Sequence, residues 1–153
     1  MKWLELKIIP PLVTLIVGLL MWVVAQFTPK ISILLKYNIL LAVIFVILGL
    51  LLMFISAYFM FKRKTTINPM KPQNASSLVT NGLFAFSRNP IYVADGLILL
   101  GWGLFLSNLF SIALIALFVL YMNKFQITPE ERNLEEIFGD EYLAYKAKVR
   151  RWV

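Results

Sequence analysis

The chain has 153 residues, of which 60% are hydrophobic and 15% charged, and its mean hydropathy is +0.79. This composition is far more apolar than that of a typical soluble domain and indicates an integral membrane protein. Because the sequence has neither cysteine nor histidine, it excludes disulfides, thiolate nucleophiles, iron–sulfur clusters and Ser-His-Asp catalysis. We therefore expect no metal site, and an enzyme built from this sequence must act mainly by positioning and electrostatics.

The first half of the chain contains two uncharged apolar runs long enough to cross a bilayer. Residues 8–27 form the first run, with Pro10 and Pro11 in its opening turn, where a missing N–H costs little. No small-residue cleavage site follows this run, so we expect it to be retained rather than removed as a signal peptide. Residues 37–61 form the second run, which stops at three consecutive basic residues, 62–64.

The stretch that follows is polar and does not continue into lipid. Residues 65–77, TTINPMKPQNASS, are rich in Pro, Asn, Ser and Thr and predict a long loop. Residues 78–87 mix apolar and small polar side chains and are too few to span, so they predict an interfacial or re-entrant segment. With the residues up to 95, this segment is expected to form the floor of a site at the membrane surface.

The second half begins with an apolar region interrupted only by a Ser-Asn pair at 107–108. Two helices, 91–106 and 109–123, would each be about 24 Å long, which is slightly short of the hydrocarbon core. They predict a hairpin in a thinned or sheltered region, in preference to one long tilted helix. Three glycines along the first of these helices would let a neighbouring helix pack closely: Gly96, Gly101 and Gly103.

Basic residues are distributed unevenly about these runs. Of the 15 Lys and Arg residues, only Lys30 and Lys36 fall between the first two runs. The positive-inside rule then predicts four spans with both termini in the cytoplasm. The membrane is expected to be the inner membrane of the cell. The expected architecture is a single integral membrane domain, 1–153, an all-α polytopic bundle with cytoplasmic helices in the tail 124–153. The basic residues on the cytoplasmic side are expected to contact anionic lipid.

The tail predicts two short helices that lie against the membrane-embedded body. Thr128 is a good N-cap, Pro129 stands at the first helical position, and Glu131 completes a capping box. Gly139 is expected to stop the first helix, and Asp140 to cap the second.

Polar residues at the start of the third run have two interpretations. Arg88, Asn89 and Pro90 place a guanidinium and an amide at a helix N-terminus, which favours an anionic group. The competing interpretation is a positive-inside anchor before a helix-starting proline. Asp95, an acid within an apolar run, predicts a functional group with Arg88 as a candidate partner. It would otherwise be an interfacial residue that reaches headgroup water.

The tail adds a second set of charged residues. Glu130 and Glu131 form an acidic pair just after the last run. The capping box accounts for Glu131, whereas Glu130 has no structural explanation in the sequence. Arg150 and Arg151 are expected to contact anionic lipid.

The order of these pieces resembles a known family. The chain is similar to the isoprenylcysteine carboxyl methyltransferase and phospholipid methyltransferase superfamily in four segments that follow one another in this order: LVTNG, SRNPIY, a glycine-containing apolar hairpin, and PEERNLEEIFGDEYLAYKAKVRRW. The resemblance covers about residues 65–152. Two positions depart from it, since many relatives have histidine at Asn89 and a basic residue at Ala85.

The resemblance implies methyl transfer from S-adenosylmethionine to a lipophilic acceptor that arrives from the bilayer. The cofactor would be held between the RNPIY segment and the acidic tail. The implied cofactor-binding residues are Gly82, Leu83, Phe84, Arg88, Asn89, Pro90, Tyr92, Glu130 and Glu131. Together with the buried acid in the third run, the candidate catalytic residues are Glu130, Asp95 and Arg88.

The chemistry available to the chain is compatible with that reaction. Methyl transfer from a sulfonium is an in-line displacement that needs neither a metal nor a protein nucleophile. A carboxylate acceptor needs no base, whereas an amine must lose a proton to Glu130, Asp95 or solvent. A lipid amine, an isoprenoid-linked carboxylate and a small hydrophobic thiol all remain open as acceptors.

Two other functions compete with this hypothesis. One is a small membrane scaffold or transport accessory protein without enzymatic activity. The other is a nicotinamide-dependent membrane reductase, which has a related core but is larger than this chain.

Overall fold

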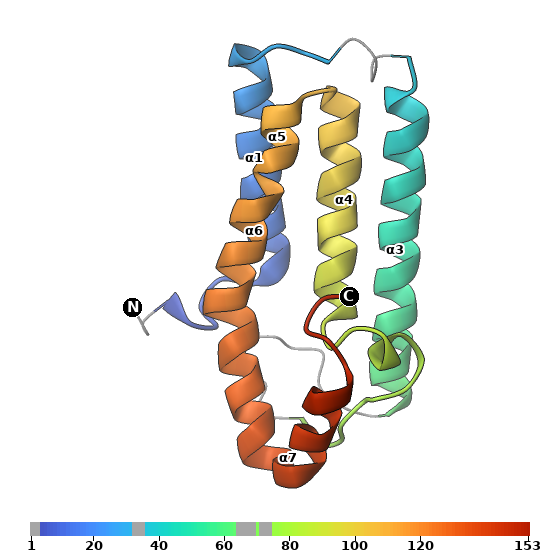
Figure 1. Cartoon of the computed structure of the whole chain (residues 1–153), viewed down its shortest axis with the longest axis vertical. Coiled ribbons are helices and arrows are strands. Elements are labelled where there is room, and N and C mark those ends of the chain that lie inside the picture. Colours follow the sequence, from blue (N-terminus) through green and yellow to red (C-terminus); the bar gives the residue numbers. More distant parts are fainter. Residues whose placement is uncertain (1–3, 32–35, 64–69, 71–74) are drawn as a thin grey trace.

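The computed structural model describes residues 4–31, 36–63, 70 and 75–153, and within them the chain forms helices and no β-strand. Helices α1 (Pro10–Phe27), α3 (Asn38–Lys62) and α4 (Pro90–Leu106) alternate in direction. The chain then returns through α5 (Leu109–Ala113) and α6 (Ile115–Tyr121), which pack beside α1 and α4. Figure 1 shows α4 between its neighbours, with α3 on one side.

Three helical stretches in the described part of the chain are long and apolar enough to cross a membrane: α1, α3 and the continuous helical run Leu109–Lys148. At 17 residues α4 is shorter, but it lies among the other helices. Large apolar side chains such as Phe27 and Leu51 are exposed on α1 and α3. An apolar surface of this extent suits lipid rather than water. The fold is therefore an all-α membrane helix bundle, as the composition predicted.

The chain reverses direction at the Ser-Asn pair that follows α4. Ser107 adopts a left-handed conformation with φ 52°. Asn108 then caps α5, because its side-chain oxygen accepts a hydrogen bond of 2.9 Å from the backbone N–H of Ser111. The predicted break thus lies at a turn between two antiparallel helices.

Two of the three glycines on α4 lie at close helix contacts. A Cβ at Gly101 would lie 2.9 Å from the carbonyl oxygen of Ala42, and one at Gly103 would lie 2.7 Å from Cγ1 of Ile112. A Cβ at Gly96 would meet nothing within 4 Å. Gly96 therefore serves no close packing, and the prediction for this residue was wrong.

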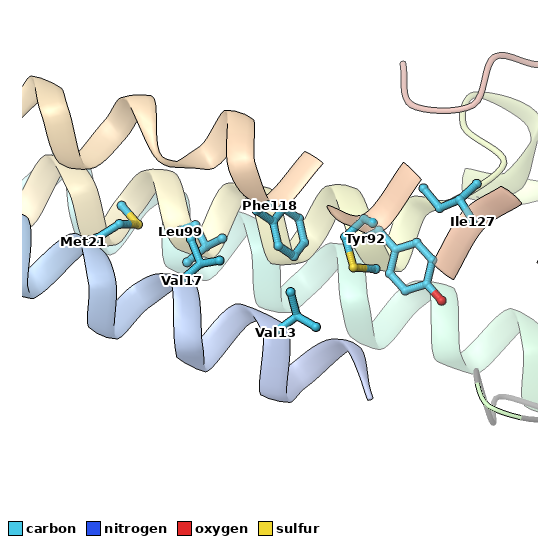
Figure 2. Packing of buried hydrophobic residues seen from close by; sticks show 8 residues of the cluster. Val13, Val17, Met21, Tyr92, Leu99, Phe118 and Ile127 are labelled. Carbon is cyan, nitrogen blue, oxygen red and sulfur yellow. The ribbon is translucent and has the colours of Figure 1, made fainter. Parts of the chain in front are cut away.

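Buried side chains from α1, α4 and α6 form the apolar core, together with those of the π-helical segment η4 (Met122–Ile127). Figure 2 shows them arranged along the axis of the bundle. The cluster consists of Val13, Val17, Met21, Tyr92, Leu99, Phe118, Met122 and Ile127. The position of Tyr92 in this cluster brings the core up to the polar end of the bundle.

The segment η4 carries α6 into α7 (Thr128–Lys148) without interruption. Thr128 has helical angles and its hydroxyl donates to the carbonyl of Asn123 at 2.7 Å. The predicted capping box is therefore not formed, since a helix that runs through Thr128 has no free N-terminus there. Gly139, with φ 50° and ψ −125°, divides α7 into two helical parts at the predicted stop.

Candidate functional site

A cavity of about 520 Å³ lies at the end of the bundle where α1 and α4 begin and α3 ends. This volume is within the range of small-molecule sites. Most of the residues predicted for the site line the cavity: Phe84, Arg88, Asn89, Pro90, Tyr92, Asp95, Glu130 and Glu131. Gly82 and Leu83 do not belong to its lining.

Gly82 and Leu83 act one step away, in the 3-10 turn η3 (Gly82–Ala85). Gly82 has φ 62°, and a Cβ there would lie 2.4 Å from the ring of Phe59. This close approach lets the turn pack on α3 and directs Phe84 inward. The carbonyl of Phe84 accepts a hydrogen bond of 2.7 Å from the hydroxyl of Tyr145. The turn therefore helps to shape the cavity.

Arg88 lies just before α4 and faces the tail. Its Nη1 donates to the carbonyls of Lys146 and Val149, both at 2.9 Å, and its Nη2 lies 2.7 Å from a carboxylate oxygen of Glu131. Its buried Nε has no hydrogen-bond partner among the described residues. The guanidinium thus joins the tail to the start of α4 and has little capacity left for a free anion.

The last residues of the tail run alongside this turn. The backbone N–H of Arg88 donates to the carbonyl of Arg150 at 2.9 Å, and the side-chain amide of Asn89 donates to that of Arg151 at 2.9 Å. The guanidinium of Arg151 binds both oxygens of Glu131, at 3.0 and 2.6 Å. The charge of Arg151 is therefore compensated inside the protein by Glu131, and its contact with anionic lipid stays a prediction.

Glu130 and Glu131 are neighbours on α7, but their pKa values are shifted in opposite directions. This helix is polar and lies beyond the apolar part of the run that leads to it. Burial acts to raise the pKa of Glu131, but hydrogen bonds and charge from Arg151 and Arg88 outweigh burial and leave this pKa lowered. Glu131 is thus a permanent anion that holds two cations together.

Glu130 is paired with neutral groups instead. It accepts hydrogen bonds from the Tyr92 hydroxyl, at 2.6 Å, and from the side-chain amide of Gln126. Burial raises the pKa of Glu130 to about 7, although these hydrogen bonds act to lower it. No cation forms an ion pair with Glu130 in the part of the chain that the structure describes. Glu130 is therefore the tail acid that can respond to a ligand.

Asp95 lines the inner part of the cavity and is only 3% exposed. It lies about one turn beyond Tyr92 on α4. The predicted pairing with Arg88 is not formed, because the ion pair of Arg88 is made with Glu131. The cavity therefore contains two carboxyl groups, Asp95 and Glu130, that no described cation neutralises.

Several residues of the cavity wall could not be found from the sequence. Tyr142 and Tyr145 line it from α7, and Met53 and Phe54 line it from α3. The tail helices were predicted to lie against the membrane-embedded body, and these two tyrosines show that the second of them covers the cavity. Nothing in the uniformly apolar sequence of α3 distinguishes the wall residues from those that face lipid.

The fold and the cavity define an integral membrane protein with a carboxyl-lined site closed by its own tail. Residues 37–141 match the phospholipid methyltransferase family, and the chain belongs to this family. It is thus a membrane protein of the methyltransferase class, as its motifs predicted.

Two relatives show how far the similarity extends. The chain is 39% identical over 72 residues to the protein-S-isoprenylcysteine O-methyltransferase of Schizosaccharomyces pombe, a match that covers 47% of this chain and 30% of the yeast protein. It is 49% identical over 63 residues to an uncharacterized protein of Haemophilus influenzae, covering 41% of this chain and the whole of that protein. No solved structure matches the chain.

Proposed function

We propose that the protein transfers a methyl group from S-adenosylmethionine to a lipophilic acceptor that reaches the cavity from the bilayer. One observation carries this proposal: a single cavity is enclosed by the RNPIY turn at the start of α4 and by the Glu130–Glu131 pair of α7. These are the two segments that the family resemblance pairs around its cofactor. The match to the phospholipid methyltransferases supports the reaction class.

The residues present fit this cofactor. S-adenosylmethionine has a cationic sulfonium, an ammonium, a carboxylate and an adenine. Glu130 suits the ammonium or the ribose hydroxyls, and the rings of Phe84, Tyr142 and Tyr145 suit the adenine or the sulfonium. The N-terminus of α4, which borders the cavity, suits the carboxylate.

The charge of the lining also favours a cation. Glu131 is balanced by Arg88 and Arg151, whereas Glu130 and Asp95 have no ion pair with a described residue. Buried carboxylates without a cation are costly, so a ligand that carries positive charge would stabilise them.

When bound, the cofactor supplies an activated methyl group that is lost to an acceptor by in-line displacement. The protein aligns the reactants, because the hydrogen bonds and ion pairs between the tail and Arg88 fix the cavity wall opposite α4. It also excludes water, because α7 packs over the cavity. Asp95 lies on the inner side, towards the membrane-embedded part of the bundle. For an amine acceptor, Asp95 or Glu130 would receive the proton, while a carboxylate acceptor would leave both unchanged.

We further propose that the cavity faces the cytoplasm from the inner membrane, with both termini on that side. Exposed basic residues gather at this end of the bundle, among them Lys62, Arg63 and Arg150. The positive-inside rule places such an end in the cytoplasm, where these residues contact anionic lipid. A reporter enzyme that is active only outside the cytoplasm can be fused after residue 153. Activity of that fusion would contradict this orientation.

Calorimetric titration of detergent-solubilised protein with S-adenosylmethionine and with its demethylated product tests the cofactor. We expect both to bind, and Glu130→Gln to weaken binding while Glu135→Gln on the outer face of α7 does not. Absence of binding of either compound at millimolar concentration would overturn the proposal. Incubation of membranes with methyl-labelled cofactor, followed by identification of the labelled product, then identifies the acceptor.

A further inference from the structure

Gln126 is a buried amide that contacts the site without forming part of its surface. It lies in the π-helical segment η4 and is only 1% exposed. Its side-chain Nε2 donates to Oε1 of Glu130 at 2.5 Å, yet Gln126 does not belong to the lining of the cavity. Its direct route to a ligand in the cavity is therefore the carboxyl group of Glu130.

The two donors of Glu130 bind the same oxygen. The Tyr92 hydroxyl donates to Oε1 at 2.6 Å, as the Gln126 amide also does. Among the described residues none donates to Oε2, and this atom is not sealed off, since the only fully buried side-chain polar atom without a partner there is Nε of Arg88. Because Glu130 lines the cavity, one oxygen is fixed and the other can bind a ligand.

The widened helix that carries this contact follows from the local sequence. Pro129 has no N–H, so the carbonyl of Phe125, four residues earlier, lacks its α-helical donor. The backbone N–H of Leu6 donates to that carbonyl at 3.0 Å instead. Thr128 donates to the carbonyl of Asn123 with its backbone N–H, in the i→i+5 pattern of a π-helix, and with its hydroxyl. Such turns are frequent at functional sites, and this one leads directly into the acidic pair of α7.

An amide suits a carboxylate that has to bind a cation. Arg88 and Arg151 compensate the charge of Glu131, whereas an amide donates a hydrogen bond without bringing a net charge. The negative charge of Glu130 therefore remains available to a ligand. A hydrogen bond to the charged form of a carboxyl group also favours that form. The bond from Gln126 acts in this way against burial, which raises the pKa of Glu130 to about 7.

We propose that Gln126 is a positioning residue, which holds Oε1 of Glu130 so that Oε2 is presented to a cationic group of the cofactor. This inference rests on the proposed function and deepens it, because it assigns a role in cofactor binding to a residue outside the cavity.

The other ionisable groups around Glu130 are common to every variant compared below. Glu131 is compensated by two arginines, and Asp95 is the other carboxyl group that no described cation neutralises. Differences between variants therefore report on Glu130 itself. The ionisable residues that line the cavity with it are Arg88, Tyr92, Asp95, Glu131, Tyr142 and Tyr145.

The first experiment follows Glu130 without a ligand. Infrared spectra of the detergent-solubilised protein are recorded from about pH 5 to about pH 9, and the protonated-carboxyl band that Glu130→Gln removes is assigned to Glu130. Gln126→Met, which keeps the length of the side chain but loses the donor, should move the midpoint of this band to higher pH. Gln126→Lys, which adds a cation, should move it to lower pH.

Thr128→Val is the control for a merely structural effect. It removes a hydrogen bond from the same helical segment but none from the carboxyl group, so the midpoint should stay that of the unchanged protein. A midpoint that stays or falls in Gln126→Met would overturn the proposal.

The second experiment titrates the same variants with S-adenosylmethionine over the pH series. Affinity is expressed relative to the unchanged protein at each pH, so that ionisation of the ligand itself cancels. Gln126→Met should bind about tenfold more weakly at pH 6 and less than about twofold more weakly at pH 8.5, where Glu130 is ionised in both proteins. Gln126→Lys should bind weakly throughout, because its cation occupies the carboxylate.

The two experiments separate failure of this inference from failure of the proposed function. A deficit of Gln126→Met that is equal at every pH and accompanied by lower stability would show that the amide only supports the fold, and would overturn the inference alone. Absence of cofactor binding in the unchanged protein would overturn the proposed function, whereas the infrared midpoints would still show whether Gln126 controls Glu130.

Discussion

The two ends of the bundle both bury polar residues, but they do so in different ways. At the end opposite the cavity, the side-chain amide of Asn108 donates to Oγ1 of Thr28 at 2.7 Å, and the hydroxyl of Ser111 donates to the carbonyl of Met21 at 2.7 Å. These groups are neutral and paired with one another. At the cavity end the buried groups are charged, and two carboxyl groups have no described cation beside them.

This difference separates structural from functional polarity. Neutral groups that pair within the fold satisfy helix ends at small net cost. Buried carboxyl groups are costly, and they persist where a ligand or a network of partners compensates for them. Changes at the cavity end should therefore affect ligand binding, while changes at the opposite end should affect stability alone.

Glu131→Gln should have the largest effect, because it leaves Arg88 without its buried counter-charge. The two side chains are 9% and 7% exposed, and removal of one partner from a buried ion pair costs about 3–5 kcal/mol. We expect lower stability in detergent unfolding and lost cofactor binding, since the tail would detach from the start of α4. A variant with unchanged cofactor affinity would show that the tail does not form the cavity wall.

Glu130→Gln should affect the ligand more than the fold. We expect cofactor affinity to fall about ten- to a hundredfold, the effect of losing one charge-assisted hydrogen bond of about 1.5–3 kcal/mol. Calorimetry over a pH series would measure this. A loss of stability comparable to that of Glu131→Gln would instead place Glu130 in the structural network.

The pH series also tests the raised pKa of Glu130, about 7. A cationic ligand favours the ionised carboxylate, so affinity should increase as the pH rises through about 7, and Glu130→Gln should remove this dependence. The stability of the ligand-free protein should change with pH in the opposite direction to the ligand affinity. The folded state retains this proton above the ordinary pKa of 4.5, so the contribution of Glu130 to stability is lost as the pH rises to about 7.

Asn108→Ala tests the opposite end. It removes the cap of α5 and the hydrogen bonds to Thr28, and we expect a loss of about 1–2 kcal/mol in the free energy of unfolding. Cofactor affinity in calorimetry should stay unchanged. A fall in affinity without a fall in stability would mean that the two ends are coupled through α1 and α4.

Glu135→Gln should have the smallest effect although it lies at the cavity end. Its ion pair with Lys146 is partly exposed to solvent on α7, and pairs at the surface contribute less than about 1 kcal/mol. Stability and cofactor affinity should both remain close to those of the unchanged protein. A large effect would show that charge at this end matters in general, rather than through the buried groups.

Local patterns allowed the fold class and the turn after α4 to be predicted, because apolar composition and an Asn cap act within a few residues. They failed at Glu131, because the helix runs through Thr128 without a free N-terminus and the carboxylate pairs instead with Arg88 and Arg151, which are distant in the sequence. They failed at Gly96 because glycine spacing does not show which face meets a neighbour. Gly101 lies about 140° further around the helix and faces α3.

The site could be predicted in part. Arg88, Tyr92 and Glu130 lie at one cavity, as expected from their motifs. The partners of Arg88 could not be predicted, since they include the backbone carbonyls of Lys146 and Val149, which no side-chain pattern reveals.

The contact between the tail and the turn before α4 has a consequence for biosynthesis. Arg150 and Arg151 bind residues 88 and 89, yet the ribosome adds them after every apolar helix of the bundle. This wall of the cavity can therefore assemble only after α1, α3 and α4 have been synthesised. A nascent chain stalled before residue 149 would hold its apolar helices together while this contact with the turn before α4 is still missing, and the cavity would be open on that side.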